Sequence, residues 1–370
     1  MAWSILKKKS IPPFHIAVPV WGDENVGLFL NYILPTHLSP NNLPALTNLE
    51  RYKDFCYRIY TTESDAKKIE STLIFKKLSA LIKTSIHYIN PQETGVPGTS
   101  TWGGQYITKS ECYKDSIAKA AEADAANIML NSDIVLSDGF FLKLYQILQS
   151  NKRVVEVIGP RTIRTDVCTI LRSKYLSEEG YIAIPPRDLA NISLKYLHPL
   201  MMRHFFDKQN ANFHPSHLYW SVGEKGILAR CFHLYPIMVY PRNKKASFST
   251  TIDDDYALNA CPKMRDTYVA NNSDELYCCE LSNLDHYVGG INEKNIPSIA
   301  NNYANTRGFR NIRLLGKVIS IHGDAIPKKE WRAIKRKSNA AINKIRYTYA
   351  KILIKRFLKR TSLFKRLCRN

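Results

Sequence analysis

The stretch Asn127-Ile-Met-Leu-Asn-Ser-Asp133 decides how the fold is interpreted. Its apolar run stops abruptly at a small polar pair and a carboxylate, and the sequence from Glu111 to Ala126 ahead of it is typical of a helix. A helix that leads into a buried strand ending in an acid indicates a parallel α/β sheet with Asp133 at its carboxyl edge. Open α/β sheets bind ligands at that edge. A carboxylate there can bind a divalent cation, and the usual partner of such a cation is a diphosphate.

Strands and helices alternate along the first 160 residues. We predict strands at 14–21, 57–60, 85–89, 127–130 and 154–159, and helices at 25–34, 66–69 and about 108–126. This alternation predicts an α/β fold with a mostly parallel sheet flanked by helices. Beyond Pro160 the pattern is less regular, with helical segments at 173–177 and 190–206 and short strands at 216–222, 226–229 and 238–240.

The charge of the chain is concentrated at its C-terminal end. Residues 328–370 contain sixteen Lys and Arg against the single acid Glu330, so they contribute +15 of the net charge of +21. We therefore divide the chain of 370 residues into four parts. These are a basic N-terminal segment (1–13), an α/β half (14–160), a less regular half (161–327) and a basic amphipathic tail (328–370).

Cysteine spacing and hydropathy indicate where the protein resides. The eight cysteines are scattered without a Cys-x-x-Cys pair, so they indicate neither a zinc site nor a disulfide framework. The N-terminal residues do not have the pattern of a signal peptide, and no apolar run is long enough to predict a membrane-spanning helix. We expect a cytoplasmic protein.

Several common catalytic motifs are absent from the sequence. The first strand is followed by no glycine-rich dinucleotide fingerprint, and the chain has no Walker sequence, nucleophile elbow or His-Glu-x-x-His motif. These absences disfavour a dehydrogenase, a kinase and a hydrolase. The chemistry-bearing residues that remain are Asp133, the acidic triplet Asp253-Asp-Asp255, and His322 in Val318-Ile-Ser-Ile-His-Gly-Asp324.

The order of elements and three short motifs resemble a known family. A first strand ending Pro19-Val-Trp21, a second leading into Thr61-Thr-Glu-Ser-Asp65, and the unit ending Asn131-Ser-Asp133 are similar to GT-A glycosyltransferases. The nearest group is the family-2-like bacterial enzymes of surface-polysaccharide synthesis, and the resemblance covers about Phe14 to Asp324. It implies transfer of a sugar from a nucleotide-sugar donor to a cell-surface polysaccharide or a lipid-linked acceptor. Residues 14–160 would then form the nucleotide-sugar-binding half and residues 161–327 the acceptor-side half.

The resemblance also implies roles for individual residues of the donor site. Asn131-Ser132-Asp133 matches the Asp-x-Asp motif of the family, with Asn131 in place of the first acid. Asp133 would bind Mn²⁺ or Mg²⁺ together with the diphosphate, and His322 would complete the metal site. The nucleotide would lie across residues 19–21, with a nearby base contact and a basic residue for phosphate or ribose. The residues implied are Pro19, Val20, Trp21, Thr62, Glu63 or Asp65 near the base, and Lys109.

The catalytic base implied by the resemblance lies in the acidic triplet. Ser249-Thr-Thr-Ile-Asp-Asp-Asp-Tyr256 resembles the later acidic motif of the family, so Asp253, Asp254 or Asp255 would be the base, with Asp254 favoured. An inverting transfer requires such a carboxylate near the acceptor hydroxyl. Simpler roles are open for the same residues: acids suit a helix N-terminus, Asp133 could belong to a turn, and His322 could be a hydrogen-bonded core residue.

The basic tail is predicted to be a helix from about Lys335. Its apolar residues recur at spacings of three and four, and lysines lie largely on other faces. This pattern predicts an interfacial helix on anionic lipid at the inner face of a membrane, with nucleic acid as the less favoured partner. The apolar residues are Ile342, Ile345, Tyr349, Ile352, Leu353 and Phe357.

Two other functions compete with glycosyl transfer. A non-catalytic membrane- or nucleic-acid-binding protein with a degenerate GT-A body would explain Asn131 in the metal motif. A nucleotidyltransferase would use the same sheet edge and metal, but it normally has a glycine-rich basic loop after the first strand, which this sequence lacks.

Overall fold

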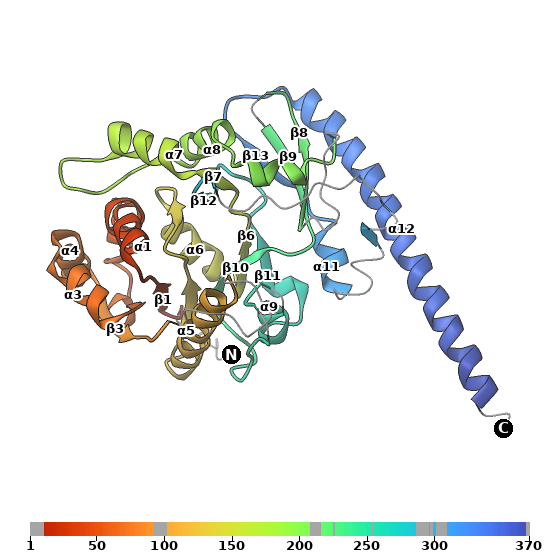
Figure 1. Cartoon of the computed structure of the whole chain (residues 1–370), viewed down its shortest axis with the longest axis horizontal. Coiled ribbons are helices and arrows are strands. Elements are labelled where there is room, and N and C mark those ends of the chain that lie inside the picture. Colours follow the sequence, from red (N-terminus) through yellow and green to blue (C-terminus); the bar gives the residue numbers. More distant parts are fainter. Residues whose placement is uncertain are drawn as a thin grey trace, which may run out of the picture. The chain divides into compact units, whose positions relative to one another are not determined.

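The chain folds into two compact units, each assembled from segments that are distant in sequence. The computed structural model describes residues 11–91, 102–207, 216–224, 226–249, 251–253, 255–285, 296, 299–300 and 309–367 (Figure 1). Unit 1 comprises Met1–Ile158, Cys168–Pro185 and Tyr235–Val269. Unit 2 comprises Gly159–Val167, Pro186–Leu234 and Ala270–Asn370. The predicted division of the chain at residues 160 and 327 stays a prediction.

Unit 1 contains a seven-stranded sheet in the order β11-β6-β10-β4-β1-β2-β3. Strands β4, β1, β2 and β3 are mutually parallel, and β10 is antiparallel to both of its neighbours, β4 and β6. The mostly parallel α/β sheet predicted from the sequence is thus confirmed. The strands are β1 (Phe14–Pro19), β2 (Cys56–Thr61), β3 (Lys83–Tyr88), β4 (Ala126–Met129), β6 (Val154–Val157), β10 (Tyr235–Val239) and β11 (Thr267–Val269).

Helices cover both faces of this sheet. All six residues of β1 are buried, because a strand in the middle of a parallel sheet is covered on both sides. Ala17 packs with Cys112 of the long helix α5 (Trp102–Glu122), whereas the ring of Phe14 contacts that of Tyr145 in α6 (Phe140–Gln149). Since side chains alternate between the faces of a strand, α5 and α6 lie on opposite faces of the sheet.

The remaining elements of unit 1 are short. They are α1 (Asp23–Leu28), the π-helical turn Phe29–Ile33, α2 (Leu34–His37), α3 (Glu63–Ser71), α4 (Leu73–Leu81), β5 (Ile134–Leu136) and α9 (Tyr256–Ala260). The helix predicted at 25–34 is thus a continuous helical stretch that widens to a π-turn in its middle. Helix α7 (Arg164–Ile170) carries the chain from unit 2 into unit 1.

Unit 2 contains two smaller strand groups. Strands β7 (Arg161–Ile163) and β12 (Cys278–Ser282) pair in parallel. Strands β13 (Ile319–His322), β9 (Gly226–Cys231) and β8 (His217–Ser221) form an antiparallel sheet in that order. Among the described residues, the helices of unit 2 include α8 (Pro186–Lys195), the 3-10 helix Pro199–His204, α11 (Phe309–Leu314) and the 40-residue α12 (Lys328–Leu367).

The basic tail is part of the core of unit 2 over its first half. The helix is confirmed, but Ile342, Ile345 and Tyr349 are buried against Leu218 and Phe232 of the β8–β9 region. In addition, Arg230 of β9 donates hydrogen bonds to Ser338 and Asn339 of α12. The expectation that these three apolar residues face lipid is therefore wrong, because their stripe is already occupied by the protein.

Helices able to cross a bilayer were sought among the described residues. None of these helices combines the length and the apolar character that a membrane span requires.

Candidate functional site

The carboxyl edge of the sheet in unit 1 carries the motif that opened the sequence analysis. Strand β4 extends to Leu130, whose N–H donates to the carbonyl of Ala17 in β1 at 2.9 Å. The chain then leaves the sheet through Asn131, Ser132 and Asp133 before β5 begins. The Oδ1 atom of Asp133 is buried and has no hydrogen-bond partner among the described residues. A buried carboxylate oxygen without a donor is costly, and ligand binding would remove that cost.

Asn131 is held by a relay of two tyrosines. The hydroxyl of Tyr235 donates to that of Tyr113 at 3.1 Å, and the Tyr113 hydroxyl donates to Oδ1 of Asn131 at 2.7 Å. Burial holds the pKa of Tyr113 well above its usual range, so its hydroxyl stays protonated and can donate. With its oxygen engaged in this way, Asn131 presents its amide NH₂ as a donor toward its other side.

Residues that flank the acidic triplet pack in the core of unit 1. Ile252 and Tyr256, which flank the triplet, belong to the same buried cluster as Tyr113 and Met129. Asp255 precedes α9 but makes no side-chain hydrogen bond to that helix, and its Oδ1 is buried without a partner among the described residues. Helix capping therefore does not account for this carboxylate. Asp253 has a partner, and the favoured Asp254 lies outside the described residues.

The predicted nucleotide-binding residues after β1 and β2 are tied to one another. The side chains of Pro19 and Val20 are buried, and Trp21 is partly exposed. Thr62 caps α3 by accepting a hydrogen bond from the Asp65 N–H. Asp65 is only 4% exposed, and its Oδ2 accepts from the N–H of Gly22 at 2.8 Å.

Asp65 is an ionised structural link between these loops. Burial alone would raise the pKa of Asp65, but hydrogen bonds from Gly22, Thr62 and Lys68 outweigh burial and lower it. Both carboxylate oxygens are occupied within the protein. Of this group, Trp21 and Thr62 are partly exposed, and the Thr62 hydroxyl is engaged in the cap of α3.

A pocket of about 380 Å³ opens at the same edge, beyond the ends of β2 and β3. Tyr60 and His87, from the ends of these strands, stack with ring centroids 4.9 Å apart. Helix α5 supplies the facing wall through residues such as Thr108, Cys112 and Asp115. The predicted Lys109 is partly exposed next to Thr108 but does not line the pocket. The full lining is Tyr60, His87, Tyr88, Ile89, Asn90, Ile107, Thr108, Glu111, Cys112, Asp115 and Lys119.

The pocket combines aromatic surface with a charged rim. The hydroxyl of Tyr60 donates to Asp115 at 2.7 Å, and Lys119 pairs with the same carboxylate. Burial would raise the pKa of Asp115, but the hydrogen bonds from Lys119 and Tyr60 lower it. Burial also lowers the pKa of His87, assisted by the charge of Lys119, so the imidazole ring is neutral at pH 7. Neutral aromatic rings beside hydrogen-bonding groups suit a flat heteroaromatic ligand.

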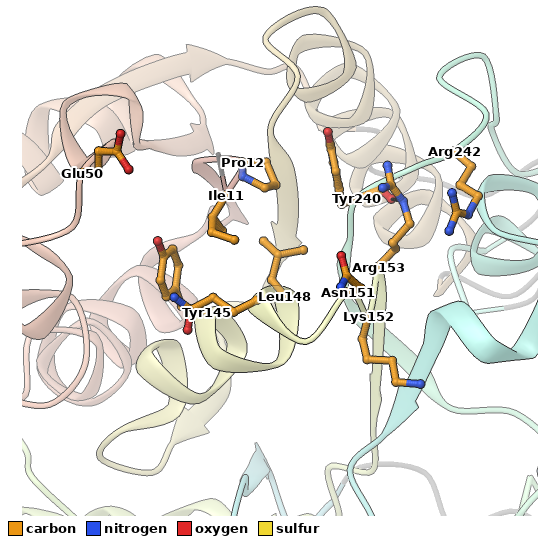
Figure 2. Close-up of a pocket in the computed structure, with 11 residues that line it drawn as sticks. Ile11, Pro12, Glu50, Tyr145, Leu148, Asn151, Lys152, Arg153, Tyr240 and Arg242 are labelled. Carbon is orange, nitrogen blue, oxygen red and sulfur yellow. Dashed lines mark hydrogen bonds between the residues drawn. The ribbon is translucent and has the colours of Figure 1, made fainter. Parts of the chain in front are cut away.

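A second pocket of unit 1, of about 460 Å³, lies at the opposite edge of the sheet. Ile11 and Pro12 precede β1, residues 151–153 precede β6, and Tyr240 follows the antiparallel β10, so all of them mark the amino edge of the parallel strands. Figure 2 shows the apolar side chains facing a basic side formed by Lys152, Arg153 and Arg242. All three cations are engaged within the protein: Lys152 donates to the carbonyl of Arg265, Arg153 donates to the carbonyls of Tyr240 and Pro241, and Arg242 pairs with Asp266. This pocket contains none of the predicted site residues.

His322 lies in unit 2 within a hydrogen-bonded network. Its Nε2 is 3.0 Å from Oδ1 of Asn272 and 3.6 Å from the Asp274 carboxylate, which Arg187 also binds. Burial lowers the pKa of His322; Asp274 acts in the opposite direction, and Arg187 adds to the lowering. The Nε2 atom of His322 is thus engaged by the protein.

Of the two predicted metal ligands, Asp133 has a carboxylate oxygen without a partner among the described residues, whereas the Nε2 atom of His322 is engaged. No group of three or more His, Cys, Asp or Glu suited to binding a metal occurs in the described part of the chain. Asp133 offers one unpartnered oxygen, whereas the oxygen of Asn131 accepts from Tyr113. Mg²⁺ is commonly bound by one or two carboxylates together with the phosphates of the substrate.

Sequence reasoning missed Tyr113 and Tyr235. Tyr113 lies on the predicted helix, at helical spacing from Ile117, Ala120 and Ala121, so its position facing the sheet was accessible from the sequence. The role of Tyr113 in the hydrogen-bond relay could not be predicted from the sequence, because Tyr235 joins the relay from a strand more than 100 residues later.

Comparisons with known proteins give only distant similarities. No protein-family model and no curated protein matches the chain. Among solved structures, S. aureus TarS matches with a TM-score of 0.33 and 8% identity, over 82% of this chain and 42% of TarS. The chain thus spans less than half of the length of TarS.

Two further structures are similar over smaller parts of the chain. A putative glucose-1-phosphate thymidylyltransferase from Bacillus anthracis matches with a TM-score of 0.24 and 6% identity, over 40% of this chain and 55% of that one. Mouse xyloside xylosyltransferase 1 matches with a TM-score of 0.24 and 12% identity, over 46% and 63%. Similarities this low indicate neither a shared family nor a shared function.

Proposed function

We propose that the protein is a glycosyltransferase that binds a nucleotide-sugar donor at the carboxyl edge of the sheet in unit 1. The observation that carries this proposal is the unpartnered, buried carboxylate oxygen of Asp133 at the end of β4. Ligands bind at this edge of open α/β sheets, and a carboxylate without a donor there is suited to a cation that accompanies a diphosphate.

Asp133 and Asn131 would bind the diphosphate from two sides. Asp133 would hold a divalent cation, Mg²⁺ or Mn²⁺, which neutralises charge on the departing diphosphate when it is bound. The Asn131 amide NH₂, oriented by Tyr113, would donate to a phosphate oxygen. In this proposal Asn131 supplies a hydrogen-bond donor at the position where the family motif has a second acid.

The aromatic pocket would hold the nucleobase. It lies at the carboxyl ends of β2 and β3, and its far wall is α5, the helix that also carries Tyr113. His87 and Tyr88 would contact the flat face of the base, while Asn90 and Thr108 could hydrogen-bond to its edge. Trp21 and Lys109 would then be available to the ribose and phosphates.

Asp255 would act as the catalytic base. In the proposed step the acceptor oxygen forms a bond to the anomeric carbon of the sugar, and the bond from that carbon to the diphosphate oxygen breaks. The leaving diphosphate takes the electron pair, and the acceptor proton passes to the Asp255 carboxylate. The free Oδ1 of Asp255 supports its choice over Asp253, which has a partner. The acceptor would be a glycan or a lipid-linked sugar.

The proposal is tested by donor binding and turnover with a pair of matched variants. A panel of UDP-, GDP- and TDP-sugars with Mg²⁺ or Mn²⁺ is screened by calorimetry and by release of the nucleotide. For the donor that binds, Asp133→Asn is expected to weaken metal-dependent binding at least about tenfold, because it removes the only charged ligand proposed for the cation. Asp255→Asn is expected to retain binding and to lose at least about a hundredfold in kcat.

Asp124→Asn is the control for Asp133→Asn. Asp124 stands just before β4, at the amino edge, whereas Asp133 follows the same strand at the carboxyl edge. The control therefore makes the same charge change and should leave binding intact. Unchanged metal-dependent binding in Asp133→Asn, or binding of no nucleotide by the unmodified protein, would overturn the proposal.

A further inference from the structure

Helix α12 has two apolar faces that lie on opposite sides of its axis. The first, formed by Ile342, Ile345 and Tyr349, is buried in the core of unit 2. The second runs along Tyr347, Ile354 and Leu358, which are 61%, 59% and 59% exposed, and Phe357, which is 68% exposed, lies between the two faces. At 100° per residue, Ile354 is about 180° from Ile345 around the helix, so the two faces cannot both serve the same core.

The second face continues where unit 2 no longer covers the helix. In Figure 1, α12 extends beyond α11, its neighbour in unit 2, as an isolated rod. Ile354, Phe357 and Leu358 of this part of the helix are each at least 59% exposed. Exposed apolar residues clustered in this way mark an interaction surface.

Basic residues border this face. Lys351, Lys355 and Lys359 are exposed and follow one another at a spacing of four, and Lys351 lies over the ring of Tyr347 at 4.6 Å. Lys351, Ile354, Lys355, Leu358 and Lys359 together line a shallow groove. The sequence contains no Asp or Glu after Glu330, so the side chains of the distal half carry a net positive charge.

We propose that the distal half of α12, from Tyr347 onward, is a docking surface for an anionic lipid bilayer. The apolar residues would enter the acyl region while the lysines contact lipid phosphates, as in other interfacial helices. The proximal half is not part of this surface, because its apolar stripe is buried in unit 2. The proposal is independent of the catalytic one, since no residue of the donor site belongs to it.

Charge and hydropathy together favour lipid over other occupants. A second copy of the helix would bring two unbalanced sets of lysines together, and like charges on adjacent helices repel. A nucleic acid would satisfy the lysines but leave Ile354, Phe357 and Leu358 in water. An anionic bilayer satisfies both groups of side chains.

The test uses the full chain and two triple variants of the same helix. The apolar-face variant carries Ile354→Ser, Phe357→Ser and Leu358→Ser, and the charge variant carries Lys351→Gln, Lys355→Gln and Lys359→Gln. A control carries Lys53→Gln, Lys76→Gln and Lys83→Gln, three exposed lysines of unit 1. Every altered side chain is exposed, and circular dichroism checks that the fold is retained.

Binding is measured by sedimentation with phosphatidylcholine vesicles that contain or lack phosphatidylglycerol. The unmodified chain and the control are expected to bind the anionic vesicles equally. Each triple variant should bind them at least tenfold more weakly, and vesicles of phosphatidylcholine alone should bind the unmodified chain poorly. Strong binding by the apolar-face variant, or none by the unmodified chain, would overturn the proposal.

Two further measurements detect the rival occupants. The first is light scattering. If the unmodified chain is a dimer and the apolar-face variant is a monomer, the surface is assigned to a second copy of the chain. The second measurement uses a single-stranded RNA oligonucleotide. If the RNA binds the unmodified chain and the apolar-face variant equally but does not bind the charge variant, the surface is assigned to nucleic acid. Either result would replace the lipid proposal.

Discussion

At the scale of single residues, the Asn131–Asp133 pair differs from two adjacent acids in a specific way. The Tyr113 hydroxyl donates to Oδ1 of Asn131, which fixes the orientation of the amide. An aspartate at this position could accept the same hydrogen bond with one oxygen and would present a second oxygen where Asn131 presents NH₂. Asn131 therefore exchanges an acceptor for a donor at the edge where the diphosphate is proposed to bind.

This exchange predicts a gain of metal affinity in Asn131→Asp. A second carboxylate near Asp133 should lower the Mn²⁺ concentration needed for half-maximal donor binding by roughly tenfold, because cation affinity rises with ligand charge. Calorimetric titration of Mn²⁺ at fixed donor concentration measures the change. An unaltered Mn²⁺ requirement would mean that residue 131 does not face the cation.

The tyrosine relay makes a separate prediction about stability. Tyr113→Phe removes the hydroxyl that donates to Asn131 and to the carbonyl of Leu130, and it leaves Tyr235 without its acceptor. We expect a loss of about 1–3 kcal/mol in the free energy of unfolding, the usual cost of leaving buried polar groups unpaired. Urea denaturation measures it, and Tyr52→Phe, whose half-buried hydroxyl donates to one carbonyl, is the milder comparison.

At the scale of elements, the parallel sheet was predictable but the role of the last helix was not. The predicted strands at 14–21, 57–60 and 85–89 correspond to β1, β2 and β3, because buried strands and their turns leave a local signal. The stripe of Ile342, Ile345 and Tyr349 is also visible in the local sequence. However, the same helical period is expected for a helix that lies on lipid and for a helix that packs on a protein core. Its partners, Leu218 and Phe232, lie more than 100 residues earlier.

Truncation within α12 distinguishes its two halves. A chain ending at Ala325 loses Ile342, Ile345 and Tyr349 from the core of unit 2. Burying one such side chain contributes about 1.5–3 kcal/mol, so their combined loss is comparable with the whole stability of a domain. We expect this chain to expose unit 2 to proteolysis, whereas a chain ending at Ala350 should resist it as the full chain does. Equal resistance of both truncations would contradict the core role of the proximal half.

At the scale of the whole molecule, the chain passes between the two units several times. Residues 168–185 and 235–269 return to unit 1 after segments of unit 2, and no change of composition marks these crossings. The two carboxylates of the proposed site show the consequence. Asp133 was identifiable from its own strand, whereas Asp255 reaches unit 1 through the late strand β10, which inserts antiparallel beside β4. Such an insertion depends on long-range packing, which local periodicity does not report.

Both units also contain buried histidines, and their protonation should lower the free energy of unfolding at acidic pH. Burial lowers the pKa of His37 in unit 1 to about 3. It lowers the pKa of His204 in unit 2 to about 4, with smaller effects from neighbours that include Arg203 and His233. Both imidazoles are therefore neutral in the folded protein at pH 5, while in the unfolded chain, with a pKa near 6.5, they are largely protonated.

The unfolded state thus binds more protons than the folded state between about pH 4 and pH 6.5, so stability falls as the pH is lowered through this range. Each histidine contributes a loss of about 1.4 kcal/mol per pH unit, or roughly 2 kcal/mol between pH 6.5 and pH 5. Urea denaturation of the unmodified protein at the two pH values measures the sum over these two histidines and the others whose pKa is lowered by burial, which include His15 and His217. His204→Phe should reduce the pH dependence by about the share of one histidine, since phenylalanine cannot take up the proton. The pH dependence of the free energy, rather than its value at one pH, is the readout, because it separates the titration of His204 from any packing change that the larger ring causes. A variant with the same pH dependence as the unmodified protein would show that His204 does not titrate differently in the two states.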